Sequence, residues 1–171
     1  QPHVEERACG WERGENLDQI FLKNPHAPVF WVGKAKLTKR VLKTQTEVLP
    51  KNYCLNVYTR VEIPTGYAHI PFLDLSGNHV PQTAEQLLRR PEMGQSSGFL
   101  LDSGNSMHFI GTSLIHSDSE LVRFYSTALL AMNLVDVRYV GHNLPDMNFP
   151  LRIAWREPNG KLNIPKVVQY W

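Results

Sequence analysis

Polar side chains recur at strand spacing in four short segments whose intervening residues are apolar. The segments supply Asp74 with Ser76, Ser106 with His108, Asp136 with Arg138, and Arg152 with Arg156 four residues later. Side chains at positions i and i+2 of a β-strand point to one face while their neighbours point to the other. If these segments are strands of one sheet with its apolar face in the core, the opposite face collects carboxylates, serines, a histidine and arginines.

This set of side chains suits phosphoryl chemistry. Carboxylate oxygens hold divalent hard cations, whereas His and Arg donors bind and neutralise polyphosphate. The pattern therefore favours nucleoside triphosphate binding with metal-assisted phosphoryl transfer. The alternative interpretation is the solvated outer face of an α/β sandwich that carries incidental charges.

The elements that must position these residues predict an α+β domain. Cys54–Glu62 and Tyr67–Leu75 are rich in strand-forming residues and predict a hairpin; Pro71 should place the second strand at an edge or make it irregular there. Ser117 and Glu120 form a capping box that begins a helix with an apolar face. Further strands are expected at Phe99–Leu101, Met107–Ile110, Val135–Val140 and Leu151–Trp155, and a further helix at Gln82–Arg90.

The first 50 residues show no comparable order. The sequence of 171 residues predicts roughly one compact domain, with an irregular, basic N-terminal segment at 1–50 and the organised part at 51–171. The basic residues of that segment are Lys34, Lys36, Lys39, Arg40 and Lys43, with no acid among them. They could lie along phosphates or form a solvated helix face.

Composition predicts a soluble cytoplasmic protein. Apolar residues make up 42% and charged residues 20%, and the formal net charge is only +2, too small to indicate a nucleic-acid partner by itself. No apolar run approaches the roughly 18 residues that cross a bilayer, so no membrane association is expected. Cys9 and Cys54 are predicted to be free thiols. Zinc-enzyme motifs such as His-Glu-x-x-His and P-loop endings are absent from the sequence.

Four motifs in order resemble those of the archaeo-eukaryotic primase superfamily, the primase-polymerases, and are most similar to its small bacterial primase-like branch. The motifs are Leu73-Asp74-Leu75-Ser76, Ser106-Met-His108, Val135-Asp136 and Leu151-Arg152-Ile153. The resemblance covers about residues 54 to 165. It implies an RRM-like mixed or antiparallel sheet with helices packed on one face.

The resemblance also implies roles for individual residues. Asp74 and Asp136 would hold Mg²⁺ or Mn²⁺, and Ser106, His108 and Arg152 would contact the incoming triphosphate. Arg156 and Lys161 match a polar stretch after the family's arginine strand and are further phosphate candidates, whereas Arg138 rests on the strand pattern alone.

One position departs from the family pattern. Ser76 stands where the family's first motif has a second carboxylate, and a hydroxyl is a poorer cation ligand. Three alternatives follow: an acid outside the motif, such as Asp102, replaces it; the site works with one metal; or catalysis is lost and nucleotide or nucleic-acid binding is kept.

The expected function is template-dependent nucleotidyl transfer of the primase type, from an NTP or dNTP to a 3′-hydroxyl. The expected partners are a nucleoside triphosphate, single-stranded or primed nucleic acid, and proteins of replication, repair or defence. A second hypothesis is a sheet that binds nucleotide or nucleic acid without turnover, with Tyr53, Tyr58, Tyr67 and Trp155 as aromatics that could stack on bases. A third is a protein-interaction module.

Overall fold

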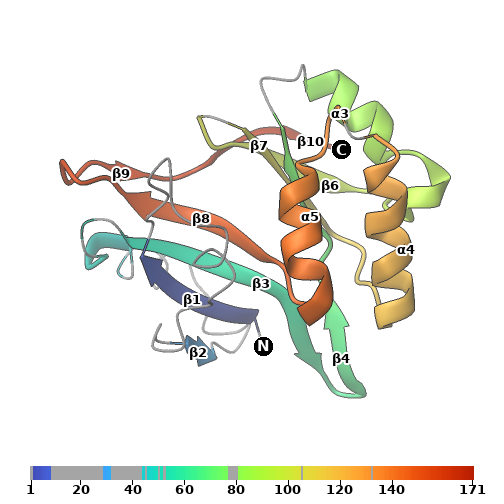
Figure 1. Ribbon diagram of the computed structural model, residues 1–171, viewed down its shortest axis with the longest axis horizontal. Coiled ribbons are helices and arrows are strands. Elements are labelled where there is room, and N and C mark those ends of the chain that lie inside the picture. Colours follow the sequence, from blue (N-terminus) through green and yellow to red (C-terminus); the bar gives the residue numbers. More distant parts are fainter. Residues whose placement is uncertain are drawn as a thin grey trace. The chain divides into compact units, whose positions relative to one another are not determined.

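The computed structural model describes residues 2–8, 29–31, 44, 46–49, 51, 53–76, 81–104, 106–131 and 133–171 (Figure 1). The chain divides into two compact units, which we describe separately. Unit 1 comprises the described residues of Gln1–Val57 together with Arg152–Ile164, and unit 2 comprises those of Tyr58–Leu151 and Pro165–Trp171. The expected boundary at residue 50 does not coincide with this division. Cys9 and the basic residues between Lys34 and Lys43 lie outside the described residues.

Unit 1 is built on a sheet of strand order β2-β1-β3-β8-β9. The strands are β1 (Pro2–Ala8), β2 (Val29–Trp31), β3 (Tyr53–Ile63), β8 (Pro150–Arg156) and β9 (Leu162–Asn163). β1 and β2 pair antiparallel, as do β8 and β9. The expectation of an irregular N-terminal segment is therefore wrong for β1 and β2, which contribute two strands to this sheet.

The small core of unit 1 forms where β3 and β8 meet. Leu55 and Ala154 are fully buried there, and Val57 and Ile153 pack against them. Cys54 is also buried, and its sulfur accepts a hydrogen bond from Asn56 Nδ2 at 3.7 Å.

Unit 2 contains a four-stranded antiparallel sheet of order β10-β6-β7-β5. Its strands are β5 (Phe72–Leu75), β6 (Gly98–Asp102), β7 (Met107–Gly111) and β10 (Lys166–Tyr170). The predicted β6–β7 hairpin is confirmed. Its turn contains Gly104 with φ 92°, which donates its N–H to Asp102 Oδ1 at 2.7 Å. A positive φ of this kind favours glycine.

Pro71 divides the strand that was expected at Tyr67–Leu75. β4 (Gly66–His69) pairs with the end of β3, whereas β5 begins after Pro71 and joins the four-stranded sheet. Because proline cannot donate a ladder hydrogen bond, the chain leaves one sheet and enters the other at this position. The predicted irregularity at Pro71 is confirmed.

Helices cover one face of the four-stranded sheet, as predicted. They are α3 (Pro81–Leu88), η2 (Pro91–Met93), α4 (Asp118–Leu129), α5 (Val137–Asn143) and η3 (Leu144–Asp146). Figure 1 shows α4 and α5 side by side against the strands. Leu73, Leu75 and Phe109 from the strands share one apolar core with the helices. Tyr125 anchors this core, since its ring stacks on Phe149 at 3.7 Å and its hydroxyl donates to Phe72 O.

The two helices expected from sequence are confirmed. α3 ends before Pro91, and Ser117 Oγ accepts the N–H of Glu120 at 3.2 Å to cap α4. No helix among the residues that the model describes is long and apolar enough to span a membrane.

Two expectations about the strands are wrong. Val135–Val140 does not form a strand, because Asp136 caps α5 and only Val135 bridges to Leu75. The four polar segments also do not share one sheet, because β5 and β7 belong to the sheet of unit 2 whereas β8 belongs to the other sheet. The fold class is nevertheless α+β, as predicted.

Candidate functional site

Asp74 and His108 face each other across two neighbouring strands. They are register partners in the β5–β7 ladder, so both side chains lie on the face of the sheet opposite the helices. His108 Nε2 lies 3.9 Å from Asp74 Oδ1. The His108 side chain is 2% exposed and the Asp74 side chain 27% exposed. The Asp74 side chain is therefore partly exposed, although its Oδ1 atom is buried, whereas the imidazole is buried.

Asp136 is held next to Asp74 by the backbone. Its N–H donates to Asp74 O at 2.9 Å, and Ser76 N–H donates to Leu134 O at 2.8 Å. These two bonds pair the end of β5 with residues 134–136 in the antiparallel sense. Although Asp136 is 62 residues from Asp74 in sequence, the two acids thus emerge from adjacent positions.

The Asp136 carboxylate accepts several hydrogen bonds from residues of α5. Its Oδ1 accepts the N–H groups of Arg138 at 2.9 Å and Tyr139 at 3.4 Å, which caps α5. The Arg138 guanidinium also donates Nε to Oδ1 and Nη2 to Oδ2. Partial burial alone would raise the pKa of Asp136, but the side-chain and backbone hydrogen bonds from Arg138 outweigh it and hold this pKa below its ordinary value.

The negative charge of Asp74 also shifts the pKa values of two residues of α5. It adds to the main effect of Asp136 in raising the pKa of Arg138. It also adds to burial, the larger cause, in raising the pKa of Tyr139, whose ring packs beside Phe149. We call Asp74, His108, Asp136 and Arg138 the Asp74 site. Tyr139 was not singled out from the sequence, although its position three residues after a capping Asp would have been the signal to look for.

The two serines near this site make local hydrogen bonds. Ser106 Oγ lies 3.0 Å from Ser103 Oγ within the β6–β7 turn, two residues before His108. Ser76 Oγ donates to Asn133 O at 3.5 Å. Asp102 is the register partner of Met107, so it lies on the opposite face of the sheet from His108 and Asp74. The register thus gives no support to Asp102 as a replacement for the carboxylate missing at Ser76.

The remaining predicted residues belong to unit 1. The Arg152 guanidinium lies 4.9 Å from the centre of the Trp155 ring. Arg156 donates to the backbone carbonyls of Leu49, Gly160, Thr46 and Glu47, so its guanidinium ties β8 to the segment before β3. Lys161 is exposed and pairs with Glu157 at 3.9 Å.

A second His–Asp pair lies elsewhere in unit 2. His69 Nε2 on β4 lies 3.0 Å from Asp118 Oδ1 at the start of α4, and Tyr67 donates its hydroxyl to Asp118 Oδ2. The Arg60 guanidinium stacks on the Tyr67 ring at 4.0 Å. Burial is the main reason that the pKa of His69 is lowered, and the Asp118 carboxylate only partly opposes it.

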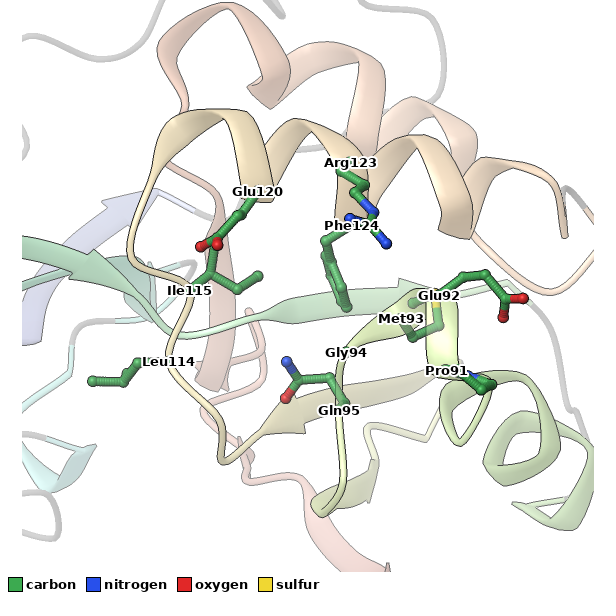
Figure 2. A pocket seen from close by; sticks show the side chains of 10 residues that line it. All are labelled: Pro91, Glu92, Met93, Gly94, Gln95, Leu114, Ile115, Glu120, Arg123 and Phe124. Carbon is green, nitrogen blue, oxygen red and sulfur yellow. The ribbon is translucent and has the colours of Figure 1, made fainter.

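The pocket shown in Figure 2 does not include the Asp74 site. It has a volume of about 250 Å³ and lies between η2 with the loop after it and α4. Figure 2 shows Gln95, Phe124 and Met93 around its interior, with the Arg123 guanidinium beside them. Glu92 and Glu120 also line it, so its charges are mixed and indicate no single ligand class.

The donors of the Asp74 site suit a hard divalent cation, but they are few. Its two carboxylates offer the oxygen ligands that Mg²⁺ and Mn²⁺ prefer. No group of three His, Cys, Asp or Glu side chains in the described part of the chain is arranged to hold a metal. Two carboxylates can ligate a cation, whose remaining ligands would come from water or substrate.

Comparison with known proteins identifies the family. The family model described as archaeo-eukaryotic primase 1D-like matches residues 33–166. Searches of curated proteins and of solved structures gave no match. The family match spans both His108 and the two acids and begins earlier than the likeness seen in the motifs, which started near residue 54. The chain belongs to the archaeo-eukaryotic primase 1D-like family.

Proposed function

We propose that this protein is a primase-type nucleotidyltransferase that adds a nucleotide from an NTP or dNTP to a 3′-hydroxyl on a template. The observation that carries the proposal is the hydrogen bond from Asp136 N–H to Asp74 O, because it holds two distant acids at one point of the fold. Family membership supports the broad class of activity.

Asp74 and Asp136 would hold Mg²⁺ or Mn²⁺ through their carboxylate oxygens. Proteins of the primase family typically use divalent metals. When bound, the cation supplies charge that offsets the negative charge of the triphosphate. Asp136 is ionised at neutral pH, and the hydrogen bonds from Arg138 lower its pKa further.

The other residues of this region would bind and orient the substrates. Ser106 comes directly before β7 and would contact the triphosphate. His108 pairs with Asp74 in the ladder and is 2% exposed, so it would act on the triphosphate through the Asp74 carboxylate. Arg138 is 79% exposed and would contact phosphate oxygens. In the transfer, a bond forms between the 3′-oxygen and the α-phosphorus, the bond from the α-phosphorus to its bridging oxygen breaks, pyrophosphate leaves and the hydroxyl proton is lost to water.

A second candidate function is nucleotide or nucleic-acid binding without turnover. Ser76 in place of a carboxylate favours it, as does the bidentate contact of Arg138 with Asp136, because both reduce the negative charge available to a cation. The two candidates differ in whether the bound nucleotide is incorporated.

Primer extension with Mn²⁺ or Mg²⁺ tests the proposal. The wild-type protein should extend a primed template, whereas Asp136→Asn should lose incorporation and keep the oxygen that caps α5. Asp136→Ala should lose both incorporation and part of its stability, about 1 kcal/mol. Glu92→Ala, at an exposed acid of the pocket in Figure 2, serves as the control and should retain activity.

Ser76→Asp separates the two candidates. Higher incorporation in this variant than in an active wild-type chain would show that the site works with reduced metal affinity. Incorporation only in Ser76→Asp would favour binding without turnover in the natural chain. Full activity of Asp136→Asn would remove the proposed site.

A further inference from the structure

The sheet face that carries Asp74 and His108 continues across two more strands. In the register, Asp74 pairs with His108, His108 with Leu101, and Leu101 with Val167. The next row along the strands contains Phe72, Ile110, Phe99 and Tyr170 in the same order. Both rows therefore run from β5 to β10 on the face opposite the helices.

A β-bulge places Tyr170 on this face. The register shifts between Val167 and Gln169, so the usual alternation is interrupted at Val168. Gln169 consequently points to the helix side, where its amide donates to Glu85 of α3. Tyr170 returns to the side of Val167 and Asp74.

The face opens to solvent toward β10. Phe72 on β5 is 2% exposed, whereas Tyr170 on β10 is 64% exposed. The Tyr170 ring lies 4.9 Å from the Phe99 ring with an angle of 31° between the planes. One side of the Tyr170 ring is thus supported by Phe99, and the ring as a whole remains accessible.

Two of the aromatics considered from sequence are less suited to stacking on a base. Tyr58 is 3% exposed, and Tyr67 is engaged by Arg60 and Asp118. Tyr170 combines exposure with a supported ring, which is the arrangement by which aromatic side chains on such sheets stack on unpaired bases.

The two rows on this face contain little negative charge. Asp74 is the only carboxylate in the two rows, and Asp102 lies on the other side of β6. Adjacent strands are about 4.8 Å apart, so three strand spacings separate β5 from β10 by about 14 Å. A few nucleotides of a single strand cover that distance.

We propose that Tyr170, supported by Phe99, is a base-stacking position for single-stranded nucleic acid that lies along this face toward the Asp74 site. The inference rests on the proposed function, because the Asp74 site defines the direction in which the nucleic-acid strand would run. Since stacking uses the faces of the bases, binding here is largely independent of sequence.

Fluorescence anisotropy with labelled oligo(dT) and oligo(U), without nucleotide or metal, tests the position. Tyr170→Ala should weaken binding about tenfold, because removal of one stacking ring typically has an effect of this order. Tyr170→Trp should bind at least as well as wild type. The matched control is Leu130→Ala, which truncates a side chain that is 85% exposed at the end of α4 and should bind like wild type.

Photocrosslinking with 5-iodouracil oligonucleotides gives a second readout, and we expect the crosslink at Tyr170 by mass spectrometry. The inference is overturned if wild type binds neither oligonucleotide, if Tyr170→Ala binds like wild type, or if Leu130→Ala loses as much affinity. Oligonucleotide binding and incorporation are separate readouts. Tyr170-dependent binding without incorporation by wild type would therefore remove the proposed function alone, whereas incorporation without Tyr170-dependent binding would remove only this inference.

Discussion

Unit 2 contains two His–Asp pairs with buried imidazoles but different surroundings. His69 and Asp118 are 3.0 Å apart, and Tyr67 donates to the other oxygen of the same carboxylate. His108 Nε2 and Asp74 Oδ1 are 3.9 Å apart, beyond hydrogen-bond distance for those two atoms, and the backbone N–H of a second acid, Asp136, donates to Asp74 O. The first pair fastens β4 to α4, whereas the second brings charged groups together at the end of a strand.

The difference shows that residue type alone does not identify a functional pair. A carboxylate that contacts only donors loses little by being partly buried, and its bonds stabilise the fold. Asp74 and Asp136 occupy adjacent backbone positions, and the Arg138 guanidinium places a positive charge beside Asp136.

The largest expected effect comes from truncating the two acids in turn. Asp74→Ala should lower primer extension about 100- to 1000-fold, with a change in unfolding free energy below about 1 kcal/mol, because it removes charge at the reaction centre. Asp118→Ala should instead lower the free energy of unfolding by about 1–3 kcal/mol, because it leaves the buried His69 imidazole without its acceptor. The activity per folded molecule should stay unchanged. Primer extension together with urea denaturation checks both; equal loss of activity in the two variants would contradict the distinction.

The His69 imidazole of the His69–Asp118 pair should contribute strongly to stability. His69 is 1% exposed, and His69→Ala removes both its contact with Asp118 and its packing, so we expect a loss of about 2 kcal/mol in unfolding free energy. His116→Ala, at an exposed histidine just before α4, should cost less than about 0.5 kcal/mol. Urea midpoints measure both, and similar midpoints would mean that the His69–Asp118 contact is not a structural link.

Local signals explain which parts of the fold could be predicted. The cap at Ser117 and the turn around Gly104 depend on residues within a few positions of each other, and both are confirmed. The irregularity at Pro71 follows from its missing N–H. In each case, the physical cause lies within the segment that the sequence displays.

Longer-range partners explain what could not be predicted. Val135, Val137 and Val140 suggest a strand, but the Asp136 carboxylate satisfies two amides of a helix and this cap outweighs strand propensity. His69 and Asp118 are 49 residues apart, so no local spacing indicates their contact. For Arg156, strand alternation predicted a position on a face, but it could not indicate the carbonyls that the guanidinium contacts.

The pH dependence of stability should also distinguish the pairs. Because burial lowers the pKa of His69, the unfolded chain binds more protons at this residue than the folded chain just below pH 6.5. The contribution of neutral His69 is therefore full above pH 6.5 and is lost as the pH falls through its lowered pKa. His69→Gln, which can still contact Asp118, should flatten this part of the curve. Urea midpoints between pH 7.5 and 5 measure the difference, and parallel curves for variant and wild type would contradict it.

The smallest effect on stability is expected at Arg138. Its side chain is 79% exposed, so loss of its ion pair in Arg138→Gln should change the unfolding free energy at neutral pH by less than about 1 kcal/mol. The pKa of Asp136 should nevertheless rise toward the ordinary carboxyl value, because the guanidinium bonds that favour the ionised form are removed. Since a lowered carboxyl pKa stabilises the fold above the ordinary value and the benefit disappears as the pH falls below about 4, the variant should lose less stability than wild type on acidification. NMR titration of the Asp136 carboxyl carbon measures the shift directly. An unchanged titration would mean that the α5 amides alone hold this carboxylate, and that Arg138 is available to phosphates without any effect on the acid beside it.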